Sequence, residues 1–414
     1  MELIEVILSK ENLNRAYKKV VSNKGASGVD RVTVEELGEY IRENKDAIVT
    51  SIRNRTYMPK PVRRVYIPKN NGKQRPLGIP TVLDRTIQQA IAQPISDIYE
   101  EIFSEYSYGF RPGRSCHDAI RQALGYLNDG YEWVVDIDIE QFFDRVNHDK
   151  LIQILREQVN DSTTLNLIRK YLKAGVMEKG LEKSTITGVP QGGPLSVVCS
   201  NVYLDKLDKE LEQRGLCFTR YADDVLIFTK SEIAANRVMK SICSWLERKL
   251  FLKVNATKTK VVRPTRSKYL GFTFLKNGSE WKVRPTNEKK KKLKKKLNEY
   301  LKRGKAVARP LAITIKRVNE IVRGWINYFR IGMMKQWKRP KTIYRNLNYL
   351  NWKHKNGFSH EEIFKVANSR LGWYKRSGMN VVNFIISKEL LENRIKDGAG
   401  LLNPLSYYLV KVGI

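Results

Sequence analysis

Three aspartates stand where the surrounding residues are otherwise apolar and β-branched. Asp223 and Asp224 are adjacent at the centre of FTRYADDVLIFTK (218–230), whose flanking residues predict two strands joined by a turn. Asp138 lies in EWVVDIDIEQFF (132–143), another stretch with the composition of a strand. A carboxylate in such a stretch is costly unless it is paired, solvated or bound to a metal ion.

Carboxylates on two neighbouring strands would form a site with oxygen ligands only, which suits Mg²⁺. Two Mg²⁺ ions about 3.5–4 Å apart can activate an attacking 3′-hydroxyl and stabilise a leaving pyrophosphate, which is the chemistry of nucleotidyl transfer. Aspartate is also common in turns, and an isolated Asp-Asp pair at a hairpin tip is more often solvated than bound to metal. Taken alone, the pair leaves both interpretations open.

The charge of the chain favours a polyanionic partner. Its 414 residues include 76 Lys and Arg against 43 Asp and Glu, which gives a formal net charge of +33. Such an excess indicates nucleic acid or an anionic membrane surface. It is concentrated in residues 285–414, which hold 30 basic and 8 acidic residues. We therefore expect a basic arm or clamp in the C-terminal third, with most acids in the larger N-terminal part.

Other global features narrow the class of protein. Hydrophobic residues make up 42% of the chain, enough for real cores, and the length suits several subdomains. No run of about 18 apolar residues appears, so no membrane span is expected. The four cysteines lack zinc-ligand spacing and are interpreted as free thiols in a reducing compartment, which indicates the cytoplasm.

Local patterns predict the elements around the acids. VRRVYIP (62–68) alternates like a strand and precedes the turn NNGK (70–73), so a hairpin is expected. Its tip carries the basic residues Lys69, Lys73 and Arg75. Helical patterns fill most of 1–60, 115–130, 149–173, 195–214, 231–250 and the basic sequence beyond Pro285.

The strand expected around Asp138 has two unlike faces. Val135, Ile137 and Ile139 share one face, and Val134, Asp136 and Asp138 share the other. Strands and helices alternate along the chain without a steady βαβ rhythm. We therefore expect a mixed α+β core followed by an all-helical region.

The order of the motifs is the most specific feature of the sequence. DIDIEQFFD, PQGGPLS, RYADDVLIF, NATKTK and YLGF follow one another at residues 136–144, 190–196, 220–228, 255–260 and 269–272. In that order they resemble the reverse transcriptases, specifically the bacterial group II intron-encoded reverse transcriptase/maturase family. NKGASGVD (23–30), SYGFRPGRSCHDAI (107–120) and RGWINYFRIG (323–332) are similar to segments special to that class.

The resemblance implies the α+β architecture of a right-hand polymerase with a mixed antiparallel palm sheet. The implied ranges are an N-terminal extension at 1–60, fingers at 61–130 with part of 149–190, a palm at 131–284, a thumb at 285–340 and a basic nucleic-acid-binding region at 341–414. RIGMM leads almost directly into KQWKRP (335–340), so we expect a shortened thumb. We expect no HNH-type endonuclease domain.

The resemblance also implies roles for residues of the DIDIEQFFD motif. Asp138 lies five residues before Phe143, as the family pattern requires, and would be the first catalytic aspartate. Asp136 does not fit that spacing and is interpreted as a structural or solvent-facing acid. Phe143 would be the steric gate against a 2′-hydroxyl, although a Phe in such a stretch is more commonly part of the core.

The remaining catalytic roles follow from the RYADD and NATKTK motifs. The resemblance makes Asp223 the second metal ligand and Asp224 a supporting third acid. The backbone carbonyl of Ile139 would complete the coordination of the nucleotide-bound ion, and the two ions would be Mg²⁺, with Mn²⁺ as a possible substitute. Lys258 would either protonate the leaving pyrophosphate or neutralise phosphate charge, and both roles are open.

A further group of residues would bind the incoming dNTP. Lys69 and Arg75 match fingers residues that grip the triphosphate, with Arg supplying a bidentate fork and Lys a point charge. Gln191 lies in the PQGG loop, where Gly192 and Gly193 allow the backbone to approach the nucleotide closely. The alternative is that Lys69 and Arg75 are simply exposed basic residues in a turn, which is the more common situation for such residues.

Template and primer would be held by residues after 265. The resemblance assigns the primer grip to the YLGF motif, and thus to Tyr269, Leu270 and Gly271. In EKKKKLKKKLNEYLKRG (288–304), leucines at helical spacing predict one buried stripe, with lysines on the remaining face. The alternative is a merely solvated lysine face. The lysines expected to contact the duplex phosphates are Lys289, Lys291, Lys292, Lys295 and Lys296.

The expected partners are an RNA template with a DNA or RNA primer, dNTPs and intron RNA, with no membrane. Two rivals remain open at this point. One is an RNA-binding splicing factor with weak polymerase activity, although intact Asp138, Asp223 and Asp224 argue against it. The other is a related reverse transcriptase recruited to defence or repair. In either case we expect a cytoplasmic protein, associated with ribonucleoprotein or the nucleoid.

Overall fold

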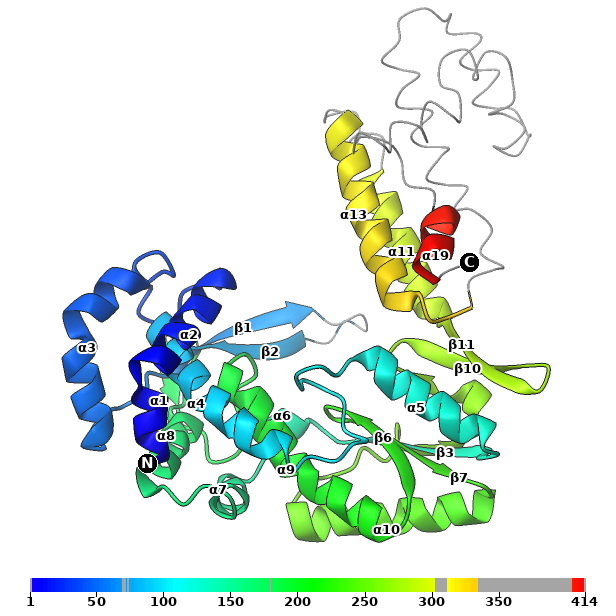
Figure 1. Ribbon diagram of the computed structural model, residues 1–414, viewed down its shortest axis with the longest axis horizontal. Coiled ribbons are helices and arrows are strands. Elements are labelled where there is room, and N and C mark those ends of the chain that lie inside the picture. The colour runs from blue at the N-terminus through cyan, green and yellow to red at the C-terminus, as the bar shows by residue number, and fades with distance from the viewer. Residues whose placement is uncertain are drawn as a thin grey trace, which may run out of the picture. The chain divides into compact units, whose positions relative to one another are not determined.

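The structure is a computed structural model that describes residues 2–68, 72, 74–178, 180–301, 311–333 and 404–412. It divides into two compact units, Met1–Pro264 and Thr265–Ile414 (Figure 1). No helix within the described ranges is both long and apolar enough to cross a membrane. The division falls inside the range 131–284 predicted as palm, so the last strands of that range belong to the same unit as the expected thumb.

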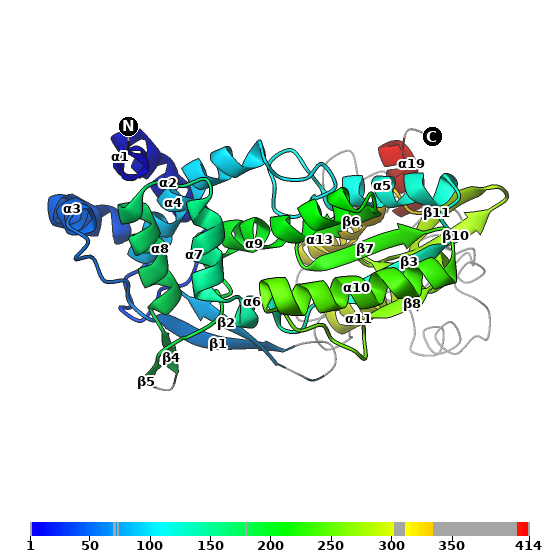
Figure 2. The same cartoon turned by 90° about the horizontal axis from the view of Figure 1, so that it is seen from below.

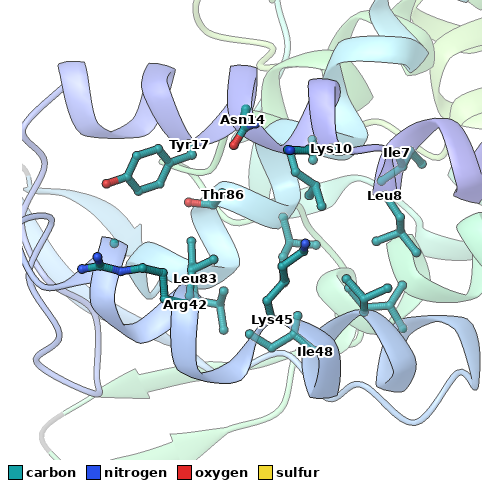
Figure 3. Close-up of a pocket in the computed structure, with 17 residues that line it drawn as sticks. Ile7, Leu8, Lys10, Asn14, Tyr17, Arg42, Lys45, Ile48, Leu83 and Thr86 are labelled. Atoms are coloured by element: carbon teal, nitrogen blue, oxygen red, sulfur yellow. The ribbon is translucent and has the colours of Figure 1, made fainter.

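Helices open the first unit, in agreement with the pattern of residues 1–60. They are α1 (Leu3–Leu8), α2 (Lys10–Ser22), α3 (Leu37–Arg53) and, after the first hairpin, α4 (Val82–Glu100). Asn12 joins α2 to α4, because its Nδ2 donates to Ala90 O (2.9 Å) and its Oδ1 accepts from Gln93 Nε2 (2.6 Å). Between α1, α2, α3 and α4 lies a cavity of about 550 Å³, lined mainly by apolar side chains (Figure 3).

The first sheet of this unit contains the predicted hairpin. Its order is β2–β1–β4–β5, and β1 runs parallel to β4. The register of β1 and β2 pairs Ile67 with Arg75 near the tip, while Lys69 and Lys73 lie outside the described residues. β4 and β5 come from the range 149–190 that was expected to contribute partly to the fingers. The strands are β1 (Val62–Pro68), β2 (Gln74–Ile79), β4 (Val176–Glu178) and β5 (Leu181–Lys183).

The second sheet is antiparallel, with the order β6–β7–β3–β8. Val135 and Ile137 are fully buried and pack in one core with Ile242 and Leu246, which confirms the predicted apolar face of β3. The helix that carries Ile242 and Leu246 runs along this sheet (Figure 2). The strands are β3 (Trp133–Asp138), β6 (Cys217–Tyr221), β7 (Asp224–Thr229) and β8 (Lys260–Val262), and the helix is α10 (Glu232–Leu250).

The other helices of the first unit complete its core around the two sheets. α9 is the longest of these and begins directly after the PQGG loop, with Pro194 in its first turn. Its buried positions include Leu204, Leu207 and Leu211, which belong to the same core as β3. The helices are α5 (Cys116–Asn128), α6 (Phe142–Arg145), α7 (His148–Arg156), α8 (Ser162–Lys173) and α9 (Pro194–Gln213).

One buried acid of α9 should make the stability of the fold depend on pH. Asp205 is 4% exposed, and among the described residues its Oδ1 has no hydrogen-bonding partner. Burial, with the charge of Asp208 next, raises the pKa of Asp205 to about 6. Because the folded state then holds its proton more tightly than the unfolded state, stability falls as the pH rises from about 4 to 6. Asp205→Asn should therefore stabilise the protein at pH 8, by up to about 3 kcal/mol, and by about half as much at pH 5.

Thermal unfolding of wild type and Asp205→Asn across this pH range measures the effect. Asp208→Asn is the matched control on the same helix. It should destabilise the protein at both pH values, because it leaves the buried Arg220 without its anion. A gain from Asp205→Asn that is equal at pH 5 and pH 8 would contradict a raised pKa.

The second unit joins a small antiparallel sheet to helices. The sheet has the order β11–β10–β9, and Phe272 of β10 packs its ring 4.9 Å from that of Phe329. Leu293, Leu297 and Leu301 are buried, which confirms the predicted stripe of the lysine-rich helix. The elements are β9 (Lys268–Tyr269), β10 (Phe272–Asn277), β11 (Glu280–Pro285), α11 (Asn287–Tyr300), α13 (Leu311–Phe329) and α19 (Pro404–Val412). The expected thumb shortening at 335–340 lies outside the described residues.

Candidate active site

The three predicted catalytic aspartates meet at one end of the antiparallel sheet of the first unit. Asp138 is the last residue of β3 and stands directly opposite Asp224, the first residue of β7. Asp223 precedes Asp224 in the tight turn from β6. Ala222, the other residue of that turn, has a φ of 57°, in the left-handed region. The predicted hairpin therefore carries its acids at the tip, next to the strand that ends in Asp138.

Negative charge accumulates at this end of the sheet. Burial and the neighbouring acids raise the pKa of Asp224 to about 6. The pKa of Asp223 is also raised, by burial and then by Asp138, while the positive charge of Arg75 opposes the shift. Carboxylates that are partly removed from water and repel one another gain free energy when a cation binds between them.

The NATKTK loop supplies cations and hydrogen bonds to β3. Lys258 Nζ lies 3.0 Å from both carboxylate oxygens of Asp138, and Thr259 Oγ1 accepts from Asp138 N (3.1 Å). Asp136 instead pairs with Lys260, its register partner on β8, at 3.5 Å. The two acids on this face of β3 thus have different lysine partners.

The donor atoms at this site fit a hard divalent cation, since they are all oxygens. In the described parts of the chain, however, no group of three or more His, Cys, Asp or Glu side chains is gathered closely enough to hold a metal ion as it stands. Asp138 is instead paired with Lys258. Binding a cation would require Asp138 to exchange this lysine for the ion.

The backbone of Ile139 lies beside this carboxylate. Ile139 is buried and forms an isolated bridge with Val254. The hydrogen bonds on either side run from Glu140 N to Lys253 O and from Asn255 N to Asp138 O, both 2.8 Å. These bonds hold residues 138–140 against the strand-like segment before the NATKTK loop, so the predicted carbonyl ligand is part of a fixed backbone.

Lys258→Met should strengthen the binding of a divalent cation to the protein without nucleotide. The substitution removes a positive charge that competes for Asp138, so the dissociation constant for Mn²⁺ should fall about three- to tenfold. Electron paramagnetic resonance of free Mn²⁺ measures this directly. Lys260→Met is the matched control, since its partner is Asp136, and it should have a smaller effect. Weaker Mn²⁺ binding in Lys258→Met would show that this lysine supports the metal site instead of competing for it.

The PQGG loop packs closely against β2. Gly78 N donates to Gln191 O (2.8 Å), and Gly192 has a φ of 130°. A Cβ on Gly192 would lie 2.5 Å from Gly78 O, and one on Gly193 would lie 2.1 Å from Gln88 Oε1. Glycine is therefore required at 192 for the backbone of the loop to lie against the first sheet, whereas the neighbour of Gly193 is the end of a side chain on α4. Arg75, on the same strand as Gly78, is exposed.

Phe143 also lies beside this loop. Its carbonyl accepts from Val189 N at 2.6 Å, just before Pro190 and Gln191. The side chain is half-buried, and its ring meets that of the fully buried Phe142 at 5.3 Å, edge to face. The ring of Phe143 is therefore partly exposed, whereas that of Phe142 is not. A residue that contacts a nucleotide must be at least partly exposed.

In the second unit, the predicted primer-grip residues form the turn between β9 and β10. Tyr269 is buried, and Leu270 and Gly271 have positive φ values of 49° and 84°. Tyr328 Oη donates to Leu270 O (2.8 Å), which ties the turn to α13. The ring of Tyr269 is thus part of the core, and the turn offers its backbone. The predicted phosphate-binding lysines are exposed along α11, at Lys289, Lys291, Lys292, Lys295 and Lys296.

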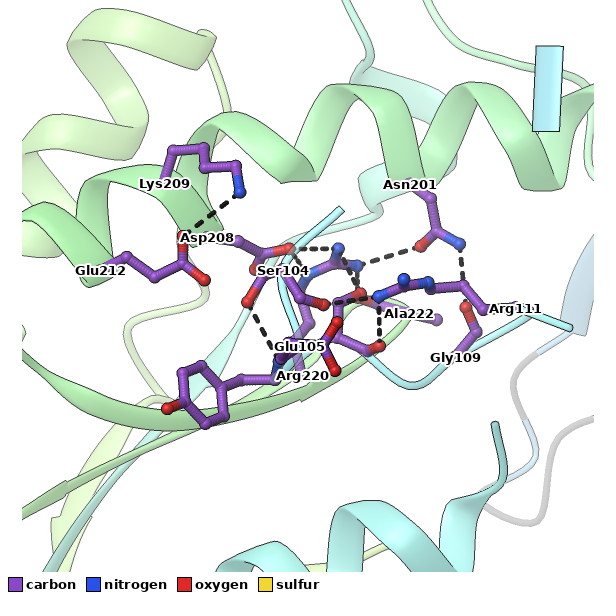
Figure 4. A network of polar contacts seen from close by, with 12 residues as sticks. Ser104, Glu105, Gly109, Arg111, Asn201, Asp208, Lys209, Glu212, Arg220 and Ala222 are labelled. Carbon is purple, nitrogen blue, oxygen red and sulfur yellow. Dashed lines mark hydrogen bonds and ion pairs between the residues drawn. The ribbon is translucent and has the colours of Figure 1, made fainter. Parts of the chain in front are cut away.

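The structure adds a residue that the sequence interpretation did not single out. Arg220 is fully buried directly beneath the turn that carries Asp223, in an ion pair with Asp208 (Figure 4). The sequence contained one signal, an arginine in the middle of a strand with a hydrophobic composition. A buried arginine needs a buried partner. Here the partner is Asp208, which lies on the preceding helix beyond a turn, so the spacing of residues within one strand does not identify it.

Two sequence families account for most of the chain. Residues 67–274 match the reverse transcriptase (RNA-dependent DNA polymerase) family, a range that contains all the aspartates described above. Residues 290–365 match the maturase-specific domain of group II introns. The first match runs from the end of β1 in the first unit into β10 of the second, and the second match begins within the lysine-rich helix.

The chain is also similar to individual proteins. The chain is 34% identical over 313 residues to Protein YkfC of Escherichia coli (strain K12), covering 66% of this chain and 81% of that protein. It is 42% identical over 208 residues to the group II intron-encoded protein LtrA of Lactococcus lactis subsp. cremoris, covering 50% of this chain but only 34% of LtrA. A telomerase structure from Candida albicans is a distant likeness, with a TM-score of 0.46 and 15% identity over 86% of this chain and 65% of that one. The chain belongs to the reverse transcriptase family, with the maturase-specific domain of group II introns, and has the right-hand polymerase fold of that family.

Proposed function

We propose that this chain extends a primer on an RNA template, with Asp138, Asp223 and Asp224 as its catalytic acids. One observation carries the proposal: Asp138 faces Asp224 across β3 and β7, with Asp223 in the adjoining turn. This constellation lies within the range that matches the reverse transcriptase family. A solvated turn does not account for it, because burial and mutual repulsion act on acids from two separate strands.

Asp138 and Asp223 would hold two divalent ions, Mg²⁺ with Mn²⁺ as a substitute, together with the carbonyl of Ile139. When bound, the ions supply the charge that lowers the pKa of the primer 3′-hydroxyl and stabilises the pyrophosphate oxygens. Asp224 would support them from the opposite strand. Lys258, which is paired with Asp138 in this structure, would lie near the departing phosphate, either as a proton donor or as a neutralising charge.

The nucleotide would lie between the PQGG loop and the first hairpin. Arg75 is exposed on β2, and its positive charge opposes the raised pKa of Asp223, so Arg75 would contribute to binding the triphosphate. Gln191 and Gly192 present backbone on the same side, and Phe143 would contact the sugar. Lys69 remains a proposal from the motif alone, since it lies outside the described residues.

A role in splicing is the second part of the proposal. The match to the maturase-specific domain begins at residue 290, within the exposed lysine face of α11. That face offers phosphate contacts to either the template–primer duplex or intron RNA, both of which are recognised through backbone and shape. The rival in which the chain is only a splicing factor predicts RNA binding without significant polymerisation. Recruitment to defence or repair would change the RNA partner and leave the chemistry intact.

Primer extension on a defined RNA template tests the main proposal. The full chain, a DNA primer and dNTPs should give full-length cDNA with Mg²⁺ or Mn²⁺ and none with a chelator. A DNA template and ribonucleotides serve as controls for template and substrate class. Tight RNA binding with no extension under either ion would refute the polymerase assignment and favour the splicing factor.

A further inference from the structure

One buried arginine holds the backbone of the turn that carries Asp223. Arg220 Nη1 donates to Ala222 O (3.0 Å) and to Asn201 Oδ1 (3.1 Å). Its Nε and Nη2 donate to the carboxylate of Asp208 at 2.5–3.0 Å. Nη2 also donates to Ser107 Oγ (2.7 Å). With four partners on three segments of the chain, the guanidinium has a single geometry, and one of those partners is the turn itself (Figure 4).

The segment around Gly109 encloses the same turn from a second side. A Cβ on Gly109 would lie 2.3 Å from Ala222 N and 2.9 Å from the carbonyl carbon of Tyr221, so the two backbones are in direct contact. Asn201 Nδ2 donates to Gly109 O (2.9 Å), so Asn201 bridges this segment to Arg220. Tyr108 N also donates to Arg220 O (2.9 Å), extending the sheet beside β6.

Stability alone does not explain a buried ion pair here. Arg220 and Asp208 have fully buried side chains, and such pairs can often be replaced by apolar residues without loss of stability. What an apolar pair could not do is hold the carbonyl of Ala222. Asn201 and Asp208 both lie on α9, the helix that begins at the PQGG loop, so the same helix anchors the loop and the turn.

We propose that Arg220, held by Asp208 and Asn201, is a positioning residue that fixes the Ala222–Asp223 peptide and so orients the Asp223 carboxylate toward the divalent ion. Arg220 contacts no reacting atom itself and acts through the backbone of Ala222. The inference rests on the proposed function, because it gives Asp223 a metal to bind. Its distinguishing consequence is a loss of metal affinity and turnover with little change in nucleotide or RNA binding.

The test replaces both members of the pair, in Arg220→Met with Asp208→Leu, so that neither charge is left buried alone. In the full chain with an RNA template and a chain-terminated primer, the dissociation constant for Mn²⁺ should rise about tenfold. With an extendable primer, kcat should fall about ten- to a hundredfold, while KM for dNTP and RNA binding stay within about threefold. Circular dichroism and thermal unfolding establish that the variant is folded.

Tyr57→Phe is a control for the loss of a buried polar contact elsewhere in the same unit. Tyr57 Oη donates to Asp84 (2.7 Å) and does not touch the turn. It should lower the melting temperature and leave Mn²⁺ binding and kcat unchanged. A folded double variant with wild-type Mn²⁺ affinity and kcat would overturn the positioning role.

If the double variant does not fold, Asn201→Ala tests the proposal instead. It leaves the ion pair of Arg220 and Asp208 in place and removes only the side chain that bridges Gly109 to Arg220. It should weaken Mn²⁺ binding and lower kcat by about threefold or more, and unchanged values would overturn the proposal. Failure of wild type to extend any primer would instead refute the proposed function, and the Mn²⁺ comparison would still report whether Arg220 orients the acids.

Discussion

Replacing Asp223 with Ala should abolish primer extension while the chain still folds and binds RNA. Asp223 is the acid of the turn, and its pKa is raised by burial and by Asp138, which places it in a shared field of negative charge. Removing a ligand to the divalent ions should cost several kcal/mol in the transition state, about a thousandfold or more in rate. Single-nucleotide incorporation measures the rate, and fluorescence anisotropy with labelled RNA measures binding.

Asp136→Asn is the matched control for this prediction. Asp136 lies on the same face of β3 as Asp138 but is paired with Lys260. Its replacement should leave the rate within about threefold of wild type, because the residue holds no ion in the proposed mechanism. Equal losses from the two substitutions, or RNA binding that falls in proportion to the rate, would mean that the acids are structural.

The parts of the fold that follow from local periodicity could be predicted from the sequence. The alternation of Val135 and Ile137 predicted the buried face of β3, and the leucine spacing of α11 predicted its buried stripe. In both cases the pattern is set by which residues avoid water within one element. The order of the motifs then identified the family, which the match over residues 67–274 confirmed.

Contacts between distant residues could not be predicted in this way. Lys258 meets Asp138 from 120 residues away, and Arg220 meets Ser107 from 113 residues away. Such pairs depend on how strands and loops are brought together, which no local period records. The division after Pro264 likewise depends on distant contacts, such as that of Phe272 in β10 with Phe329 in α13, and it falls inside the range 131–284 that the resemblance implied as palm.

Phe143→Ala should weaken the discrimination against ribonucleotides. The backbone of Phe143 is fixed by Val189 N at 2.6 Å, next to the PQGG loop, and its ring is half-buried. If the ring lies under the sugar, removing it opens space for a 2′-hydroxyl that would otherwise clash. The ratio of kcat/KM for dNTP to that for rNTP should then fall about ten- to a hundredfold, corresponding to ~1–3 kcal/mol. Steady-state incorporation of one dNTP and its matching rNTP on the same RNA template measures this ratio.

Substitution of the adjacent Phe142 is the control that distinguishes a steric gate from a core residue. Its ring is fully buried and meets that of Phe143 at 5.3 Å, so the two side chains are alike in chemistry and differ in exposure. Phe142→Leu should lower the melting temperature, because a smaller side chain fills the same space less well, and should leave sugar selectivity unchanged. If Phe143→Ala lowers the melting temperature and the overall rate but keeps the wild-type ratio of dNTP to rNTP use, the ring of Phe143 is core as well. Selection against the 2′-hydroxyl would then come from another part of the site.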